Sequence, residues 1–85
     1  MKKKYRLVDF IGRKVKIVNS PCKNLIGLEG EIIDEEKFYF IIERKVERKG
    51  KIIKKIAKIM KKNTMFEING ELINGSDILS TPEER

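Results

Sequence analysis

Two glycines three residues apart, Gly27 and Gly30, interrupt the apolar residues 25–34 and constrain the fold more than any other feature of the chain. Glycine weakens the interior of a strand, so its presence there indicates a bulge, a sharp bend or a close approach of another backbone. A strand that bends near its middle lets a short sheet curl into a small closed barrel. We therefore predict a bent strand over residues 26–34.

Residues 14–18 alternate between basic and apolar side chains, which is the two-residue period of a half-buried strand. Val15 and Ile17 are expected to face the core, and Lys14 and Lys16 the solvent. This strand would therefore carry a basic stripe on its outer side.

Residues 38–43 give the strongest strand prediction, because they are aromatic or β-branched up to the last residue. Phe38 and Phe40 share one face and are expected in the core. Tyr39 lies on the opposite face, where it is the better candidate for stacking on an unpaired base.

A hairpin is predicted near the C-terminal end of the chain. Residues 64–68 and 71–73 both contain alternating apolar side chains. They flank Asn69-Gly70, a dipeptide that is typical of a two-residue hairpin turn.

Two charged segments are interpreted as connections between strands. Residues 35–37 form a turn in which Glu35 and Glu36 are expected to be solvated. Residues 44–51 form a charged hairpin connection that Gly50 closes.

Residues 51–62 fit two structures. Their apolar side chains recur at helical spacing with lysines on the other face, and by periodicity alone this favours a basic amphipathic helix. The same residues can form two short β-branched strands around a turn at Lys54-Lys55. Closure of a barrel requires strands here, so the local preference and the fold conflict.

Charge is distributed unevenly along the chain. The 85 residues are enough for a single domain, residues 1–85, with a basic N-terminal arm (1–10) and a C-terminal tail (76–85). Residues 1–62 contain 19 Lys and Arg against 8 Asp and Glu, whereas residues 63–85 contain 1 against 5. This split predicts a polyanion as the ligand of the basic part and a different role for the acidic tail.

The residue types give no support for enzyme chemistry within the chain. The chain has no His and a single Cys, Cys22, so we expect no metal, no cofactor and no Cys–His nucleophile. A lone cysteine cannot form an intrachain disulfide, which fits a reducing cytoplasm. No apolar run reaches about 18 residues, so no membrane span is expected.

Four segments carry a combined signature: I-G-R-K-V-K-I-V at residues 11–18, L-I-G-L-E-G-E-I-I-D-E at 25–35, G-E-L-I-N-G at 70–75 and P-E-E-R at 82–85. In this order they resemble the archaeal ribonuclease P protein component 1 family, the Sm-like barrel subunits of that ribonucleoprotein. The resemblance covers residues 7–85 and is specific only as a combination.

The resemblance implies a fold, a function and partners. The fold is all-β: a small, twisted, antiparallel Sm-like or SH3-like barrel of five to six strands, with short terminal extensions that need not be ordered. Strands would then cover residues 51–62. The function is RNA binding within the enzyme that removes the 5′ leader from precursor tRNA, whose catalytic component is RNA. The partners are the specificity half of the ribonuclease P RNA, a small zinc-binding protein subunit and, indirectly, precursor tRNA.

Three sets of residues are expected to carry these roles. Phosphate contacts are assigned to basic residues: Lys2, Lys3, Lys4, Arg6, Arg13, Lys14, Lys16, Lys23, Arg44, Lys45 and Arg48. Contacts with the protein partner are assigned to Leu7, Val8, Phe10, Asp77, Glu83 and Glu84. The glycines expected to be structural are Gly12, Gly27, Gly30, Gly70 and Gly75.

Two other interpretations stay open. A ribosomal or other KOW-type small barrel has the same order of strand, loop, glycines and strand as residues 14–33, but it does not share the pattern of residues 66–85. A membrane-surface protein would act through residues 51–62 and requires a helix there.

Overall fold

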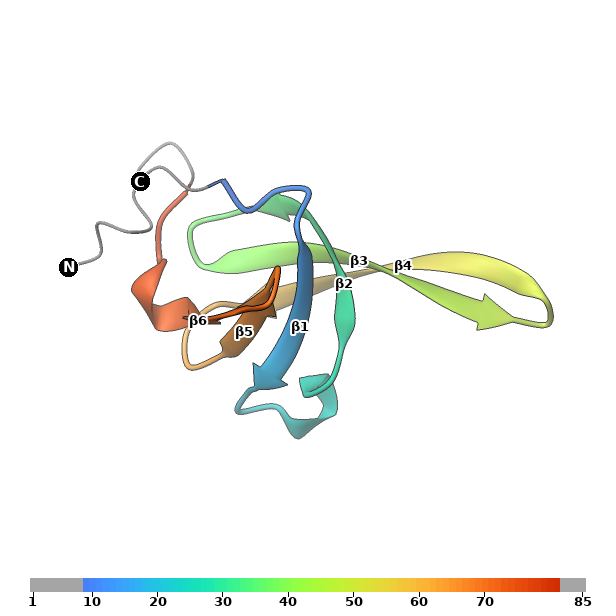
Figure 1. Ribbon diagram of the computed structural model, residues 1–85, viewed down its shortest axis with the longest axis horizontal. Coiled ribbons are helices and arrows are strands. Elements are labelled where there is room, and N and C mark those ends of the chain that lie inside the picture. Colours follow the sequence, from blue (N-terminus) through green and yellow to red (C-terminus); the bar gives the residue numbers. More distant parts are fainter. Residues whose placement is uncertain (1–8, 82–85) are drawn as a thin grey trace.

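One antiparallel sheet of six strands makes up the fold (Figure 1). The computed structural model describes residues 9–81, and within them no helix is long and apolar enough to cross a membrane. The elements, with η denoting a 3-10 helix, are β1 (Lys14–Asn19), η2 (Lys23–Leu25), β2 (Glu29–Glu35), β3 (Tyr39–Arg48), β4 (Lys51–Met60), β5 (Met65–Ile68), β6 (Glu71–Asn74) and η3 (Gly75–Asp77). Their spatial order in the sheet is β4-β3-β2-β1-β5-β6. This confirms the predicted all-β, antiparallel fold of a small barrel.

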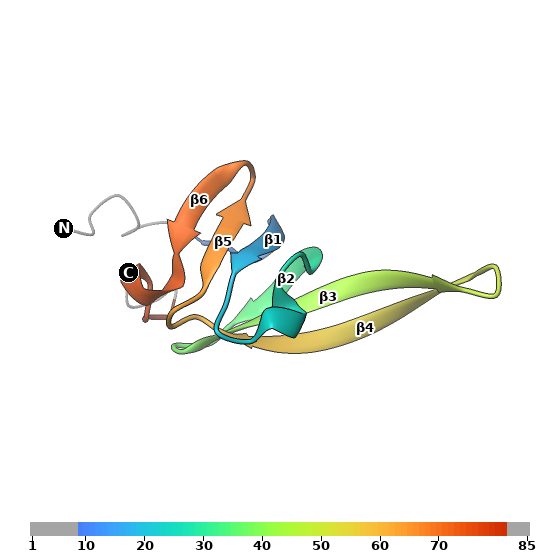
Figure 2. The same cartoon turned by 90° about the horizontal axis from the view of Figure 1, so that it is seen from below.

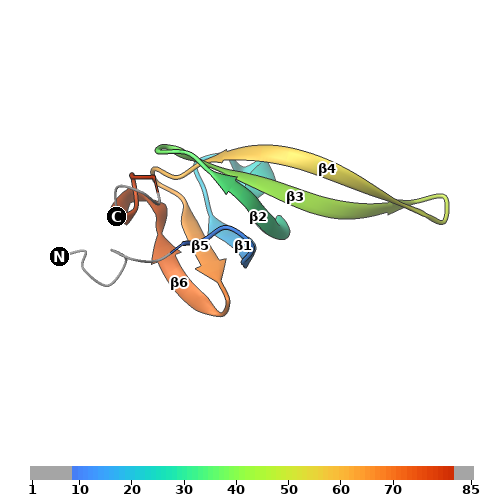
Figure 3. The ribbon, with the colours of Figure 1, turned by 90° about the horizontal axis from the view of Figure 1, so that it is seen from above.

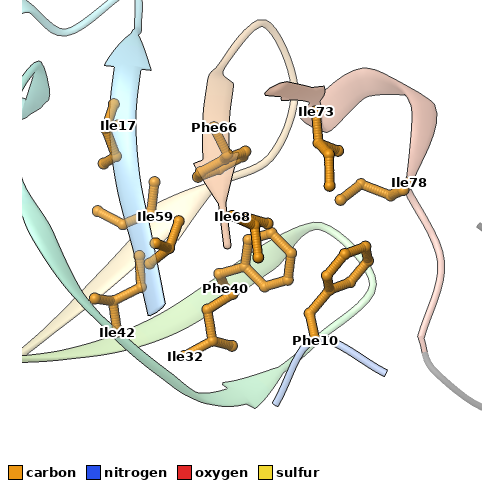
Figure 4. Packing of buried hydrophobic residues seen from close by; sticks show 11 residues of the cluster. Phe10, Ile17, Ile32, Phe40, Ile42, Ile59, Phe66, Ile68, Ile73 and Ile78 are labelled. Carbon is orange, nitrogen blue, oxygen red and sulfur yellow. The ribbon is translucent and has the colours of Figure 1, made fainter. Parts of the chain in front are cut away.

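The sheet curls around one apolar core. Figures 2 and 3 show β5 and β6 on one side and the base of β3 and β4 on the other, and Figure 4 shows buried side chains converging between them. The ring of Phe40 meets Phe10 at 5.7 Å and Phe66 at 5.2 Å between centroids, both edge to face. Such pairs add about 0.5–1.5 kcal/mol each beyond the burial of their area. Val15 and Ile17 also lie in this core, as predicted.

Two bulges give the sheet its curvature. The register of β1 against β5 shifts between Ile17 and Asn19. The register of β2 against β3 shifts between Ile32 and Asp34. An extra residue in one strand bends that strand and increases its twist, so bulges in two neighbouring strands let a short sheet wrap around its core.

The two glycines near β2 do not form the predicted bend. β2 begins at Glu29, so Gly27 lies in the turn before it with φ of +91°, and the prediction that the strand includes Gly27 is wrong. Gly30 lies inside β2, where a Cβ atom would come within 2.5 Å of the Glu43 carbonyl oxygen and 2.6 Å of Ile42 Cγ2. Gly30 therefore permits the close approach of β3.

The β5–β6 hairpin has the predicted turn. Asn69 and Gly70 have φ of +53° and +84°, the left-handed pair that a two-residue type I′ turn requires. Beyond β6, Gly75 is buried, and a Cβ there would overlap the carbonyl oxygen of Lys61. Gly12 also has a positive φ, of +92°.

A single long strand, β4, replaces the helix that periodicity favoured for residues 51–62. It pairs with β3 at ten successive positions, from Tyr39 opposite Met60 to Arg48 opposite Lys51. Neither the helix nor two short strands around a turn is correct, because the ladder with β3 satisfies this backbone along its whole length and overrides the local pattern. For the same reason the hairpin connection is shorter than predicted, with only two residues between β3 and β4.

A buried lysine joins the ends of β2 and β4 to the C-terminal segment. Lys61 Nζ donates to Glu35 Oε2 at 2.7 Å and to the carbonyl oxygens of Ile78 at 2.9 Å and Ser80 at 2.8 Å. It also lies 5.0 Å from the centroid of the Phe40 ring. The side chains of Lys61 and Glu35 are fully buried, so the prediction that Glu35 is solvated is wrong. Sequence alone gave no sign of the pair, because its members are 26 positions apart.

Replacing Lys61 with Met should lower the free energy of unfolding by about 3 kcal/mol or more, because it removes the ammonium group that neutralises the buried Glu35 carboxylate. Denaturant unfolding of the full chain measures this loss. The double variant Lys61→Met with Glu35→Leu should recover part of it, since an apolar pair requires no desolvated charge.

Lys62→Met is the matched control, because Lys62 is the next residue and is exposed. It should change stability by less than about 0.5 kcal/mol. Equal effects of the two single substitutions would show that the buried ion pair contributes nothing beyond an exposed lysine.

Candidate nucleic-acid interface

The outer face of β1 borders an open groove of about 760 Å³. Lys14 and Lys16 project into it from β1, as the alternation predicted, and Lys45 joins them from β3. The groove also holds acidic side chains from three neighbouring strands: Glu29, Glu31, Glu43 and Glu67.

Glutamates lie directly opposite the lysines of β1. Lys14 is paired across the strands with Glu31, and Lys16 lies between Glu29 and Glu67. Lys16 Nζ is 3.8 Å from Glu29 Oε2, but both side chains are at least half exposed, so this ion pair contributes at most about 1 kcal/mol. A phosphate at this groove would therefore meet carboxylates as well as ammonium groups.

The remaining predicted contacts near β1 are spread out. Arg13 is half-buried before the strand, and its Nε donates to the carbonyl oxygen of Asp9 at 2.9 Å. Lys23 is exposed in η2, beyond the opposite end of β1. The predicted contacts of the N-terminal arm lie outside the described residues: Lys2, Lys3, Lys4 and Arg6.

A second basic surface projects from the barrel. Pairing of β2 with β3 ends at Glu31 and Glu43, and residues 44–55 of β3 and β4 continue beyond it, paired with each other. We call residues 44–55 the β-arm; Figure 1 shows it extending away from the rest of the sheet. It carries seven Lys and Arg side chains and one acid, Glu47.

The β-arm contains both predicted and unforeseen cations. Arg44, Lys45 and Arg48 were expected in a loop, but they lie in the regular part of β3. Sequence reasoning did not propose Lys54 and Lys55, within residues 51–62, as RNA contacts. The signal that was present is the β-branched content of that segment, which favours a strand.

The aromatic residues at the start of β3 are less buried than predicted. Phe38 precedes β3 and is 51% exposed, so its assignment to the core is wrong, whereas Phe40 is fully buried. Tyr39 is half-buried, and Lys58 Nζ lies 4.6 Å from its ring centroid. Stacking of Tyr39 on a base stays a prediction.

The residues assigned to a protein partner fall into three environments. Phe10 lies in the hydrophobic core, with 1% of its surface exposed. Asp77 is exposed in η3. The other members of the set lie outside the described residues: Leu7, Val8, Glu83 and Glu84.

The surroundings of β1 and the β-arm present ammonium and guanidinium groups, which can bind anions. No group of three or more His, Cys, Asp and Glu within residues 9–81 could hold a metal ion. Cys22 is exposed as a free thiol. The buried carboxylate of Glu35 accepts a hydrogen bond from the ammonium group of Lys61.

Comparison with known proteins agrees with the resemblance found in the sequence. The family model for ribonuclease P/MRP, subunit p29, matches residues 3–85. Ribonuclease P protein component 1 of Staphylothermus marinus is 34% identical over 82 residues, which cover 91% of this chain and 82% of that protein. The protein of the same name from Sulfurisphaera tokodaii is 32% identical over 83 residues, covering 93% of this chain and 97% of the relative.

A eukaryotic relative extends the match. The RNases MRP/P 32.9 kDa subunit of Saccharomyces cerevisiae is 35% identical over 75 residues, covering 87% of this chain but only 25% of the yeast protein. The similarity thus spans nearly the whole chain, including the segments on which the resemblance rested. The chain belongs to the ribonuclease P/MRP subunit p29 family.

Proposed function

We propose that the chain binds the RNA of ribonuclease P through phosphate contacts and supports removal of the 5′ leader from precursor tRNA without catalysing it. The observation that carries this proposal is the family match over residues 3–85. The net charge of +7 supports it, because clustered Lys and Arg release counterions when they neutralise phosphates.

We assign the RNA contacts to two surfaces. The first is the surroundings of β1, with Arg13, Lys14, Lys16 and Lys23, together with the basic residues of the N-terminal arm. The second is one face of the β-arm. Glutamates flank Lys14 and Lys16 on the first surface, so a phosphate bound by these lysines must avoid the neighbouring carboxylates.

The role of such contacts is to hold RNA in its folded form. Phosphates that come close together in a folded RNA repel one another, and fixed cations reduce this repulsion. The RNA partner in this proposal is the specificity half of the ribonuclease P RNA, with precursor tRNA engaged indirectly. The protein partner is a small zinc-binding subunit, and the site of action is the cytoplasm.

A tagged full-length chain recovered from an extract of its source cells at moderate salt should enrich ribonuclease P RNA over ribosomal RNA. The variant Lys14→Gln with Lys16→Gln should retain roughly three- to tenfold less of it, because two cations are removed while Glu29, Glu31 and Glu67 stay in place. Sequencing of the bound RNA measures both effects.

The control variant is Lys37→Gln with Lys62→Gln, which removes the same charge from exposed positions away from β1. Equal losses in the two variants would mean that only net charge matters. Enrichment of ribosomal RNA by the parent chain would instead favour a KOW-type ribosomal barrel and would overturn the proposed function.

The acidic tail gives a separate prediction. Glu83→Lys with Glu84→Lys should weaken binding of the zinc-containing subunit at least tenfold, because it reverses two negative charges in the acidic tail. RNA affinity should stay the same or rise slightly. Titration of each partner against the purified full chain separates the two effects; unchanged affinity for the protein partner would remove the tail from that interface.

A further inference from the structure

The register of β3 and β4 sorts the charges of the β-arm onto two different faces. Residues directly opposite each other in an antiparallel pair point to the same side, and successive residues alternate. Phe40 and Ile42 of β3, with Ile59 of β4, face the core and define the inner side. Every second residue of β3 after Ile42 therefore lies on the inner side, and so does the residue of β4 that is opposite it.

The inner face of the β-arm contains three cross-strand pairs: Arg44 with Lys55, Val46 with Ile53, and Arg48 with Lys51. It therefore presents four cations and no acid. The outer face holds Lys45 with Lys54 and Glu47 with Ile52. The one acid of the β-arm thus lies on the outer face, on the same side as Lys45, which borders the groove beside β1.

The four inner cations have no competing partners among residues 9–81. The ion pairs within this range lie elsewhere, at Lys16, Lys58 and Lys61. Arg44 is half-buried, and its Nε atom is covered from solvent and makes no hydrogen bond to a described residue. An arginine whose stem is held by its neighbours loses less side-chain entropy when its guanidinium binds an anion.

The spacing of the cations fits two separate rows of phosphates. Arg44 and Arg48 are four residues apart on one strand, which places the two cationic pairs roughly 13 Å apart along the β-arm. Between them, Val46 and Ile53 form an apolar pair. This pair can lie over the sugars of an RNA, because it has no polar group that needs a hydrogen-bond partner. In A-form RNA the wide, shallow minor groove separates the two phosphate backbones and leaves the sugars accessible.

We propose that the inner face of the β-arm lies across the minor groove of double-helical RNA. The Arg44–Lys55 pair contacts the backbone of one strand and the Arg48–Lys51 pair that of the other. This inference rests on the proposed RNA binding and names the form of RNA and the face that meets it. Paired RNA is favoured over single strands because the β-arm has no aromatic side chain on which an unpaired base could stack.

Two double variants of the full chain test the assignment. Lys51→Gln with Lys55→Gln removes two charges from the inner face, and Lys45→Gln with Lys54→Gln removes two from the outer face. All four lysines are exposed, so neither variant disturbs the core. The probe is a short, perfectly paired RNA duplex, compared with one of its strands alone.

The inner-face variant should bind the duplex roughly tenfold more weakly at physiological salt, and its plot of log affinity against log salt should flatten by roughly 0.9 for each phosphate that is no longer neutralised. The outer-face variant should bind less than about twofold more weakly. The Lys37→Gln, Lys62→Gln variant should bind this short duplex as the parent does, because both residues are exposed and lie outside the β-arm.

Three outcomes would overturn the inference. They are equal losses of affinity in the two β-arm variants, a parent that binds the single strand more tightly than the duplex, and an inner-face variant that loses the protein partner while keeping RNA. In each of these cases a parent that still retains ribonuclease P RNA from extract leaves the proposed function standing. Failure of the parent to bind any RNA would instead refute the proposed function itself.

Discussion

The pairing of β3 with β4 over ten registered positions shapes both the core and the surface of the molecule. Its first half supplies Phe40, Ile42 and Ile59 to the core. Its second half leaves the barrel and becomes the β-arm. Because one ladder fixes both halves, the side chains that fill the core also determine which cations appear on each face of the β-arm.

Other interactions keep this ladder in place relative to the sheet. Gly30 lets β2 approach the backbone of Glu43, at the point where the barrel ends and the β-arm begins. At the other end of β4, the Lys61 ammonium holds Glu35 of β2 and two carbonyl groups of the C-terminal segment. A chain of 85 residues buries too little surface to tolerate the removal of many such interactions, so each of them is expected to matter for stability.

The sequence predicted the structure correctly where the residues that determine it are neighbours in the chain. The alternation of residues 14–18 correctly placed Val15 and Ile17 in the core, and Asn69-Gly70 correctly marked a two-residue turn. Sequence reasoning failed where a segment or side chain depends on a partner that is far away in the chain. The sequence of β4 has helical periodicity, and its pairing with β3 makes it a strand. Glu35 was predicted to be solvated, because its partner Lys61 is 26 positions away in the chain.

The candidate site shows the same division. The uneven charge distribution predicted a basic surface that binds a polyanion, and the family resemblance identified RNA as that polyanion. Which lysines stand beside glutamates, and which stand on an acid-free face, follows from strand register and not from the order of residues. That is why Lys14 and Lys16 stood out in the sequence, whereas the inner face of the β-arm became visible only in the structure.

The most direct test of RNA binding by the inner face is a hydroxyl-radical footprint of the full chain on ribonuclease P RNA. We expect protected sugars on both strands of a paired segment, facing each other across a minor groove. This protection should vanish in the Lys51→Gln, Lys55→Gln variant and persist in the Lys45→Gln, Lys54→Gln variant. Protection confined to unpaired nucleotides, or unchanged in the inner-face variant, would contradict the assignment.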